Sequence, residues 1–235
     1  MISYNSNIVT DGLKIHVDAG NKRSYPGTGT VWYNIAPNAT LNGTRVGAVT
    51  WNANEGQGSM YFSGVTSAGQ YYLFGAGTNY IISNTFTFES WFKSSGMGVG
   101  QTEGGLWSGT YLLRFFTTPG SAVQMISYNS STSASNNGPV STGFNSAENK
   151  WHHVVATNDG VSGFLYIDGK LNNTAIANCY EFSRYITSNF AIGIDINNTM
   201  LNFNGYIAIG RYYNRNLSYK EVTQNFNAQR GRFGL

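Results

Sequence analysis

The fold of this chain is decided by residues 151–170, whose sequence is WHHVVATNDGVSGFLYIDGK. Its two ends, 151–157 and 164–170, are rich in alternating β-branched and aromatic residues, which is typical of β-strands. Asn158-Asp159-Gly160 lies between them, and an Asp-Gly pair favours a tight reversal of the chain. A second pair, Asp168-Gly169, predicts another reversal directly after the second strand. The stretch therefore predicts neighbouring antiparallel strands.

Further strands are predicted on both sides of this stretch. Residues 13–17 alternate between apolar and polar side chains, so one face of this opening strand is apolar. Residues 86–93 alternate in the same way, with the phenylalanines on the face opposite Glu89 and Trp91. The polar segments 96–105 and 130–138 are expected to be exposed loops. Other short strands are predicted at 59–62, 71–74, 80–82, 112–116, 123–128 and 205–210.

One helix is predicted near the C-terminal end of the chain. Ser218 is the expected N-cap, and Glu221, three residues later, completes a capping box. Gly231 is the expected end of the helix. Leu217 and Val222 occupy the two hydrophobic-staple positions, and Phe226 continues the apolar face of the helix.

The order of these pieces resembles the laminin G-like branch of the concanavalin A-like lectin/glucanase jelly rolls. The resemblance rests on residues 12–20 (GLKIHVDAG), 86–93 (FTFESWFK) and the strands at 151–157, 164–170 and 205–210, followed by the capped helix. It implies an all-β fold, a concanavalin A-like antiparallel β-sandwich jelly roll with one short C-terminal helix.

The composition agrees with a single domain of this class. A chain of 235 residues is long enough to bury a full hydrophobic core. Charged residues make up 11% of the chain, aromatic residues make up 15%, and there are 29 glycines. This profile is typical of many short strands joined by turns. We therefore expect one laminin G-like domain over residues 1–235.

Charge and cysteine content exclude several classes of function. The net charge of +3 comes from 14 basic and 11 acidic residues scattered along the chain, without the dense basic patch that nucleic-acid binding needs. No apolar stretch is long enough to cross a membrane. Cys179 is the single cysteine, which excludes an intramolecular disulfide, and no segment like a signal peptide precedes the first strand. The chain is therefore expected to be made in a reducing cytoplasm.

The carboxylates do not form the pair that a glycosidase requires. A retaining enzyme needs two carboxylates about 5 Å apart, which two positions of one strand spaced by two residues would supply. Glu89 is the natural candidate, but its same-face neighbours are Thr87 and Trp91. Asp168 and Asp195 also lack a carboxylate two residues away. The sequence therefore predicts no catalytic residue and no enzymatic activity.

The metal-ligating residues are also dispersed. His152 and His153 are adjacent on a strand, so their side chains point to opposite faces and cannot share an ion. The laminin G resemblance implies calcium as an alternative, because many such domains bind one ion at a rim through oxygen ligands. Asp18, Asp159 and Asp195 lie near turns and are its candidate ligands, although no dense acidic loop marks a site. We expect no cofactor, with calcium kept as the alternative.

Aromatic residues are the candidates for ligand contact. The chain has 16 tyrosines and five tryptophans, which can stack on sugar rings. Trp91 and Trp151 lie inside strand patterns and are expected to be structural. Trp32, Tyr33 and Trp107 lie nearer loops and are candidates for exposed contacts.

The residues after the helix are candidates for partner contact. They include two cations and two large apolar side chains, which are unfavourable to leave in water. The tail either folds back on its own domain or docks on a partner, and both alternatives stay open. Its candidate contact residues are Arg230, Arg232 and Phe233.

Residues 18–27 and 225–235 resemble the corresponding parts of stand-alone laminin G-like proteins of tailed bacteriophages. The resemblance implies a non-enzymatic virion structural protein, made in the host cytoplasm and displayed on the particle surface as a head decoration or a tail or fibre component. The expected partners are other virion proteins of the capsid or tail, host-surface glycans and further copies of the chain in a homo-oligomer. The alternative is a free bacterial carbohydrate-binding module or lectin.

Overall fold

The computed structural model describes residues 7–65, 69–75, 85–96, 104–109, 113–117, 122–128, 135–175, 189–196 and 198–235. The strand predicted at 80–82, Cys179 and parts of the two predicted polar loops lie outside these residues.

The first of two large sheets has eight strands. Its strands are β1 (Leu13–Asp18), β4 (Thr50–Asn52), β5 (Ser59–Ser63), β7 (Thr85–Ser94), β12 (Trp151–Asp159), β13 (Gly163–Ile167), β14 (Lys170–Ala175) and β18 (Asn204–Tyr213). They follow the order β14-β13-β12-β7-β18-β5-β4, and β1 pairs with the C-terminal half of β18. All of these pairings are antiparallel.

The second sheet closes the sandwich. Its strands are β2 (Val31–Trp32), β3 (Gly43–Val46), β6 (Tyr71–Phe74), β8 (Gly104–Gly109), β9 (Leu113–Thr117), β10 (Val123–Tyr128), β11 (Ser135–Val140) and β15 (Phe190–Ile192). Their order is β11-β10-β9-β8-β15-β6-β3-β2. A short hairpin pairs β16 (Ile194–Asp195) with β17 (Asn198–Asn202).

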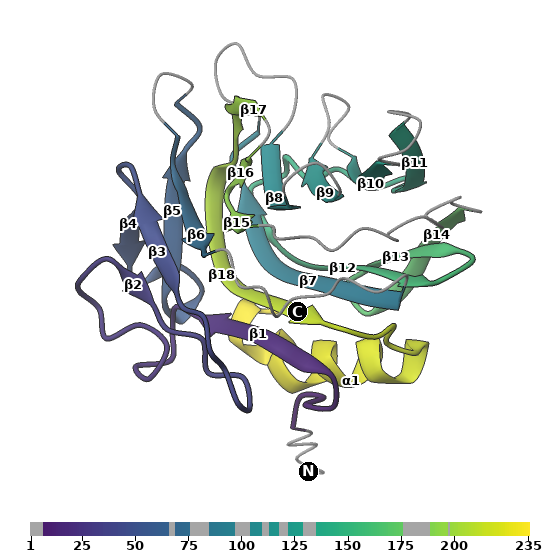
Figure 1. The fold of residues 1–235 in the computed structure, drawn as a ribbon, viewed down its shortest axis with the longest axis horizontal. Coiled ribbons are helices and arrows are strands. Elements are labelled where there is room, and N and C mark those ends of the chain that lie inside the picture. Colours follow the sequence, from purple (N-terminus) through teal and green to yellow (C-terminus); the bar gives the residue numbers. More distant parts are fainter. Residues whose placement is uncertain are drawn as a thin grey trace.

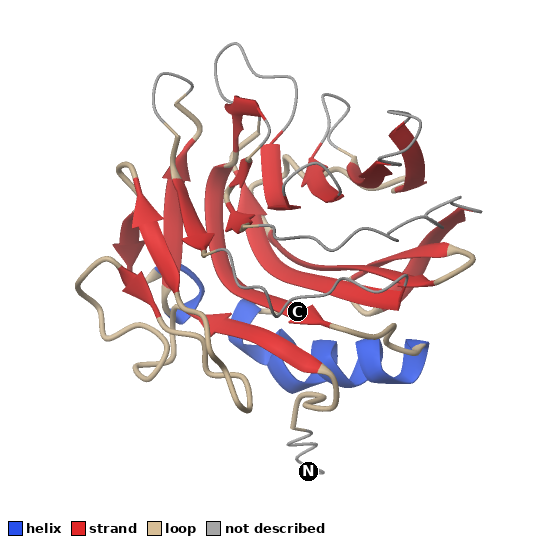
Figure 2. Ribbon diagram, in the orientation of Figure 1, coloured by secondary structure: helices blue, strands red, loops and turns tan. Residues whose placement is uncertain are grey.

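Helical structure is scarce in the described residues. It consists of the helix α1 (Tyr219–Gln229) and the short 3-10 helices η1 (Glu55–Gln57) and η2 (Arg230–Phe233). Figures 1 and 2 show α1 along the convex side of the first sheet, while β8, β9 and β10 lie on its concave side. The prediction of an antiparallel β-sandwich with one short C-terminal helix is confirmed. Within the part of the chain that the structure describes, no helix is long and apolar enough to span a bilayer.

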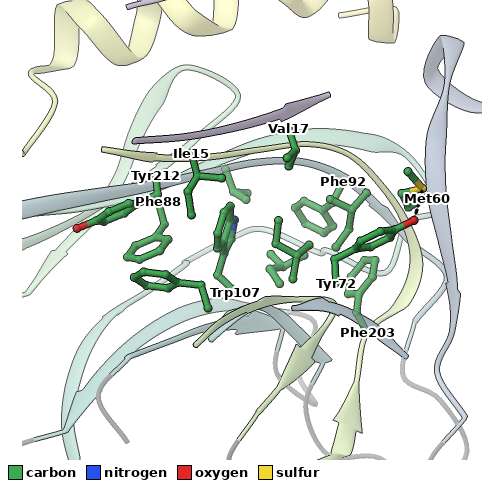
Figure 3. Close-up of a cluster of buried hydrophobic side chains, with 14 of the residues drawn as sticks. Ile15, Val17, Met60, Tyr72, Phe88, Phe92, Trp107, Phe203 and Tyr212 are labelled. Atoms are coloured by element: carbon green, nitrogen blue, oxygen red, sulfur yellow. Dashed lines mark hydrogen bonds between the residues drawn. The ribbon is translucent and has the colours of Figure 1, made fainter. Parts of the chain in front are cut away.

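The main hydrophobic core lies between the two sheets (Figure 3). Alternation along β1 and β7 places every second side chain on the concave face of the first sheet, where it meets the second sheet. Phe88 is part of this core, with ring contacts to Trp107 and Tyr212 at centroid distances of 5.3 and 4.9 Å. The residues labelled in Figure 3 are Ile15, Val17, Met60, Tyr72, Phe88, Phe92, Trp107, Phe203 and Tyr212.

The predicted turns and helix start are confirmed. Gly160 has a φ of +96° between β12 and β13, and Asp168 and Gly169 have φ values of +48° and +74° between β13 and β14. Two successive residues in the left-handed region form the tight reversal that Asp-Gly favours. At the start of α1, the Ser218 side chain accepts from the Glu221 N–H, and the Glu221 side chain accepts from the Ser218 N–H.

The α-helix ends close to the predicted residue, with Gln229 as its last residue and Arg230 as its C-cap, but Gly231 is not a left-handed cap. Gly231 has no left-handed φ and lies inside η2, so the chain stays helical for one further turn. The left-handed residue that ends it is Gly234, with a φ of +76°. Packing of the last turn against the first sheet extends the helical segment, because an isolated glycine lowers helix stability without forbidding it.

The two segments predicted as polar loops also contain strands. Residues Ser135–Val140 form β11, which pairs with β10, and Gly104–Gly109 form β8, which pairs with β9 and β15. Backbone hydrogen bonds to a neighbouring strand hold these segments in the sheet, even though both contain glycine, which is depleted in strands.

Candidate functional site

The convex face of the first sheet carries Glu89 and His153, two of the polar residues that the sequence singles out. On β7, alternation turns Phe88 and Phe92 into the core and turns Glu89, Trp91 and Lys93 to the convex face. Helix α1 and η2 cover the middle of this face, and the part over β4 and β5 lies beyond them (Figure 1). The covered and uncovered parts have different chemistry.

Under the helix, Glu89 is the centre of a buried polar network. It is paired across the strands with Arg211 of β18, and the two side chains form an ion pair that is closed to solvent. His153 Nε2 lies 3.1 Å from Glu89 Oε1. The Asn225 amide of α1 donates to Glu89 Oε2 at 2.7 Å, and Arg211 donates to Gln229 Oε1 at 2.8 Å. The network fastens the helix to the sheet.

These partners fix the charge of Glu89. Burial alone would raise the pKa of its carboxyl, but the Arg211 guanidinium and the hydrogen bonds from His153 and Asn225 lower that pKa to about 2. Both oxygens already accept from protein groups. A carboxylate that is ionised at neutral pH cannot serve as a general acid, and one that is enclosed with both oxygens hydrogen-bonded cannot contact a substrate.

His16 lies beside the same network. It faces Arg211 in the register of β1 and β18, and its Nε2 has no hydrogen-bond partner among the described residues. Burial and the positive charge of Arg211 hold the pKa of His16 well below its usual value of 6.5, against the opposing effect of Glu89. The imidazole is therefore neutral near neutral pH.

The stability of the domain is expected to fall on acidification in two stages. Below pH 6.5 the unfolded chain protonates His16 while the folded chain resists, so the unfolded state binds more protons and is favoured. Below pH 4.5 the unfolded chain also protonates Glu89, whose folded pKa is about 2, so its contribution is lost as the pH falls from 4.5 towards 2. Denaturant unfolding between pH 8 and pH 3 measures both. His16→Gln should remove the first stage and keep the second; an unchanged profile above pH 4.5 in that variant would contradict the assignment to His16.

The candidate calcium ligands are not brought together. Asp18 Oδ1 accepts from Arg232 at 2.7 Å and from the Gly20 N–H at 2.9 Å. Asp159 accepts from two backbone N–H groups of its own turn, and Asp195 is buried beside β17. The residues that the structure describes contain no group of three His, Cys, Asp or Glu side chains that could hold a metal ion. Calcium binding therefore stays a prediction.

The three aromatic residues predicted to contact a ligand differ in how deeply they are buried. Trp32 and Trp107 are fully buried, so their prediction as exposed contacts is wrong. Trp32 packs edge-on against Tyr72, and Trp107 Nε1 donates to Ser90 Oγ at 2.9 Å. Both lie in strands, β2 and β8, and the pleat rather than the nearness of a loop decides which way each points. Tyr33, the residue after Trp32, is 42% exposed, as predicted.

The tail after α1 folds back on its own domain, which is one of the two predicted alternatives. Phe233 is buried and stacks on Trp91 at a centroid distance of 4.2 Å. Arg232 pairs with Asp18 and also donates to the carbonyls of Gly56 and Gly58. These contacts occupy Arg232 and Phe233 within the chain.

Arg230 differs from the other two tail candidates. Its side chain is exposed, with the guanidinium carbon 5.9 Å from the centroid of the Phe226 ring. It remains accessible to a partner, although it is a single cation on the surface.

Beyond the tail, two tyrosines lie side by side on the uncovered part of the convex face. Tyr61 of β5 and Tyr206 of β18 are register partners, and both are partly exposed. Sequence analysis did not single them out. The alternation of buried Met60 and Phe62 with Tyr61 could have indicated its outward direction, but the pairing with Tyr206 depends on strands far apart in the chain.

The chain matches a known protein family. The family model described as the concanavalin A-like lectin/glucanases superfamily, of laminin G type, matches residues 66–223. A comparison with curated protein sequences finds no match.

Similar solved structures include the binding domains of two toxins. The botulinum neurotoxin serotype D binding domain matches with a TM-score of 0.69 at 14% identity, covering 94% of this chain and 53% of that one. The binding domain of Paraclostridial Mosquitocidal Protein 1 matches with a TM-score of 0.70 at 14% identity, covering 92% and 52%. The chain thus spans about half the length of these toxin domains.

A third similar structure matches over its whole length. It is domain 4 of AbnA, a GH43 extracellular arabinanase from Geobacillus stearothermophilus, in complex with arabinotriose. The TM-score is 0.63 at 17% identity, covering 92% of this chain and 99% of that one. At these identities the likeness establishes the fold.

Proposed function

The chain belongs to the concanavalin A-like lectin/glucanases superfamily, and on that premise we propose that it is a non-enzymatic module that binds a glycan. The observation that carries the proposal is the pair of partly exposed tyrosines, Tyr61 and Tyr206, among polar side chains on the uncovered sheet face. Aromatic rings with polar groups beside them suit sugars, which have both apolar faces and hydroxyls.

A hydrolytic role is less well supported. Glu89 is the carboxylate best placed on a central strand, and it is enclosed by Arg211, His153 and Asn225 under α1. Substrate cannot reach it while the helix is docked, and a retaining mechanism needs a second carboxylate about 5 Å away. Two of the similar structures described above are binding domains by their titles, and the third is an arabinanase domain in complex with arabinotriose, which agrees with a binding role.

We further propose that the module is displayed on the surface of a tailed-bacteriophage virion, as a head decoration or a tail or fibre component. This part rests on the resemblance of residues 18–27 and 225–235 to phage laminin G-like proteins. Virion proteins of the capsid or tail, and further copies of the chain, are its proposed partners.

A free carbohydrate-binding module or lectin of a bacterium is the second candidate. It is favoured by the similarity to the arabinanase domain, which was solved in complex with arabinotriose. The match covers 99% of that domain's length. In that case the chain would act on its own or attached to another protein.

Two measurements separate these candidates. The purified protein is expected to bind at least one oligosaccharide on a glycan array and to release no reducing sugar from polysaccharides. Mass spectrometry of purified phage particles from the source is expected to find the protein in stoichiometric amounts. Glycan binding without presence in particles would favour the free module, and release of reducing sugar would overturn the non-enzymatic assignment.

A further inference from the structure

We propose that Tyr61 and Tyr206 form the platform of a binding site for an uncharged sugar residue, on the convex face of the first sheet. This inference rests on the proposed glycan-binding function and assigns it to one surface and one class of ligand. Below, the "tyrosine site" means these two residues with Thr50, Ser63, Lys93, Asn204 and Glu55.

The two rings form a continuous aromatic surface. Tyr61 and Tyr206 are directly opposite each other on β5 and β18, with ring centroids 4.9 Å apart and an interplanar angle of 42°. The next residue of each strand, Phe62 after Tyr61 and Ile207 after Tyr206, points into the core. The platform is therefore held by a well-packed sheet, which limits the entropy lost when a ligand binds.

Neither tyrosine is needed to complete a hydrophobic cluster. The buried clusters of the convex face are formed around Trp91 and around Val222, and neither includes Tyr61 or Tyr206. A partly exposed aromatic pair outside the core is available for contact with a ligand.

The charges beside the platform cancel each other. Lys93 of β7, the register partner of Tyr206, places its Nζ 5.7 Å from the Tyr206 ring centroid. The same Nζ lies 2.9 Å from Glu55 Oε2 at η1. The site therefore has one cation and one anion already paired, a charge distribution that complements a neutral ligand. An acidic sugar would have to compete with Glu55 for Lys93.

Polar groups surround the platform on the same face. Thr50 of β4 is exposed and is the register partner of Tyr61, while Ser63 and Asn204 are register partners one pleat further along β5 and β18. The Ser63 hydroxyl is hydrogen-bonded to the Gln70 side chain, so Thr50 and Asn204 are the polar groups best placed to bind a ligand. Hydroxyl and amide groups beside aromatic rings match the two kinds of surface on a pyranose or furanose: C–H groups that stack on a ring and hydroxyls that form hydrogen bonds. A neutral glycan is the occupant that this chemistry fits.

The test uses an array of neutral gluco-, galacto-, manno- and arabino-oligosaccharides together with sialylated oligosaccharides. Titration calorimetry then measures the affinity for the strongest neutral hit. Tyr206→Ala and Tyr61→Ala are each expected to weaken binding by about tenfold, which corresponds to about 1.4 kcal/mol, because each removes one of the two rings of the platform. Thr50→Arg tests the same site at an exposed position, where a long side chain can cover the rings without disturbing the core.

Tyr219→Ala is the matched control. Tyr219 is 55% exposed and stacks on Tyr166 of β13 at 6.2 Å, at the start of α1 and away from the tyrosine site. This variant is expected to bind like the wild type. Thermal unfolding of all four variants checks folding, and Thr50→Arg keeps the test valid if a tyrosine variant does not fold.

The outcomes separate the site from the function. Absence of binding to every glycan overturns the proposed function itself. Wild-type binding that survives in the folded Tyr206→Ala, Tyr61→Ala and Thr50→Arg variants overturns the tyrosine site and leaves the function standing. Preference for sialylated glycans overturns the assignment of a neutral ligand. A change from dimer to monomer in these variants, with glycan affinity unchanged, would identify the face as a contact between copies of the chain and overturn the proposal.

Discussion

Glu89→Gln is expected to lower the free energy of unfolding by about 3–5 kcal/mol, because it leaves the buried guanidinium of Arg211 without its anion. The new amide also points a donor group at a donor. Urea denaturation at pH 7, with the unfolding midpoint and slope fitted together, measures the loss.

Two further variants give this experiment its controls. Glu148→Gln removes the exposed ion pair with Lys150, whose atoms are 2.9 Å apart, and is expected to leave stability unchanged. The double variant Glu89→Met with Arg211→Met removes both buried charges and is expected to recover much of the loss. A Glu89→Gln protein as stable as the wild type would show that the charge of Glu89 does not stabilise the network under α1.

Phe233→Ala is expected to lower the free energy of unfolding by about 3 kcal/mol, because it removes a buried ring from a stack on the first sheet. The Phe233 ring lies 4.2 Å from Trp91 and 4.9 Å from Trp151, centroid to centroid. A Cβ at Gly56 would come within 2.9 Å of Phe233, so η1 also closes around this ring. Thermal and urea unfolding measure the change.

Leu235→Ala is the control for the tail, because Leu235 is 43% exposed and lies beyond η2. It is expected to unfold like the wild type. Removal of residues 230–235 should destabilise the domain more than Phe233→Ala, since Arg232 then also loses its ion pair with Asp18. A truncated protein of wild-type stability would show that the tail is available for docking rather than part of the fold.

The sequence by itself determined the local elements of this domain. Residue alternation at 13–17 and 86–93 predicted strands with one apolar face, and Asp-Gly pairs predicted the turns around β13. Ser218 and Glu221 predicted the start of α1, because a capping box involves residues only three apart. The lack of a second carboxylate near Glu89 in its strand was equally a local property.

Only the tertiary structure decided which distant residues meet. Trp32 and Trp107 are buried because the second sheet closes over the first, which their nearness to loops could not reveal. Phe233 stacks on Trp91 although the two residues are 142 positions apart in the sequence.

The same holds for the two sites on the convex face. The alternation of side chains along a strand indicates that Glu89 and Tyr61 point away from the core. The register between strands that are remote in sequence places Arg211 beside Glu89 and Tyr206 beside Tyr61. That register is fixed by the packing of the whole sandwich, since a shift of one residue would turn each apolar face to solvent. Local pattern therefore gives the direction of each side chain, and global packing gives its partner.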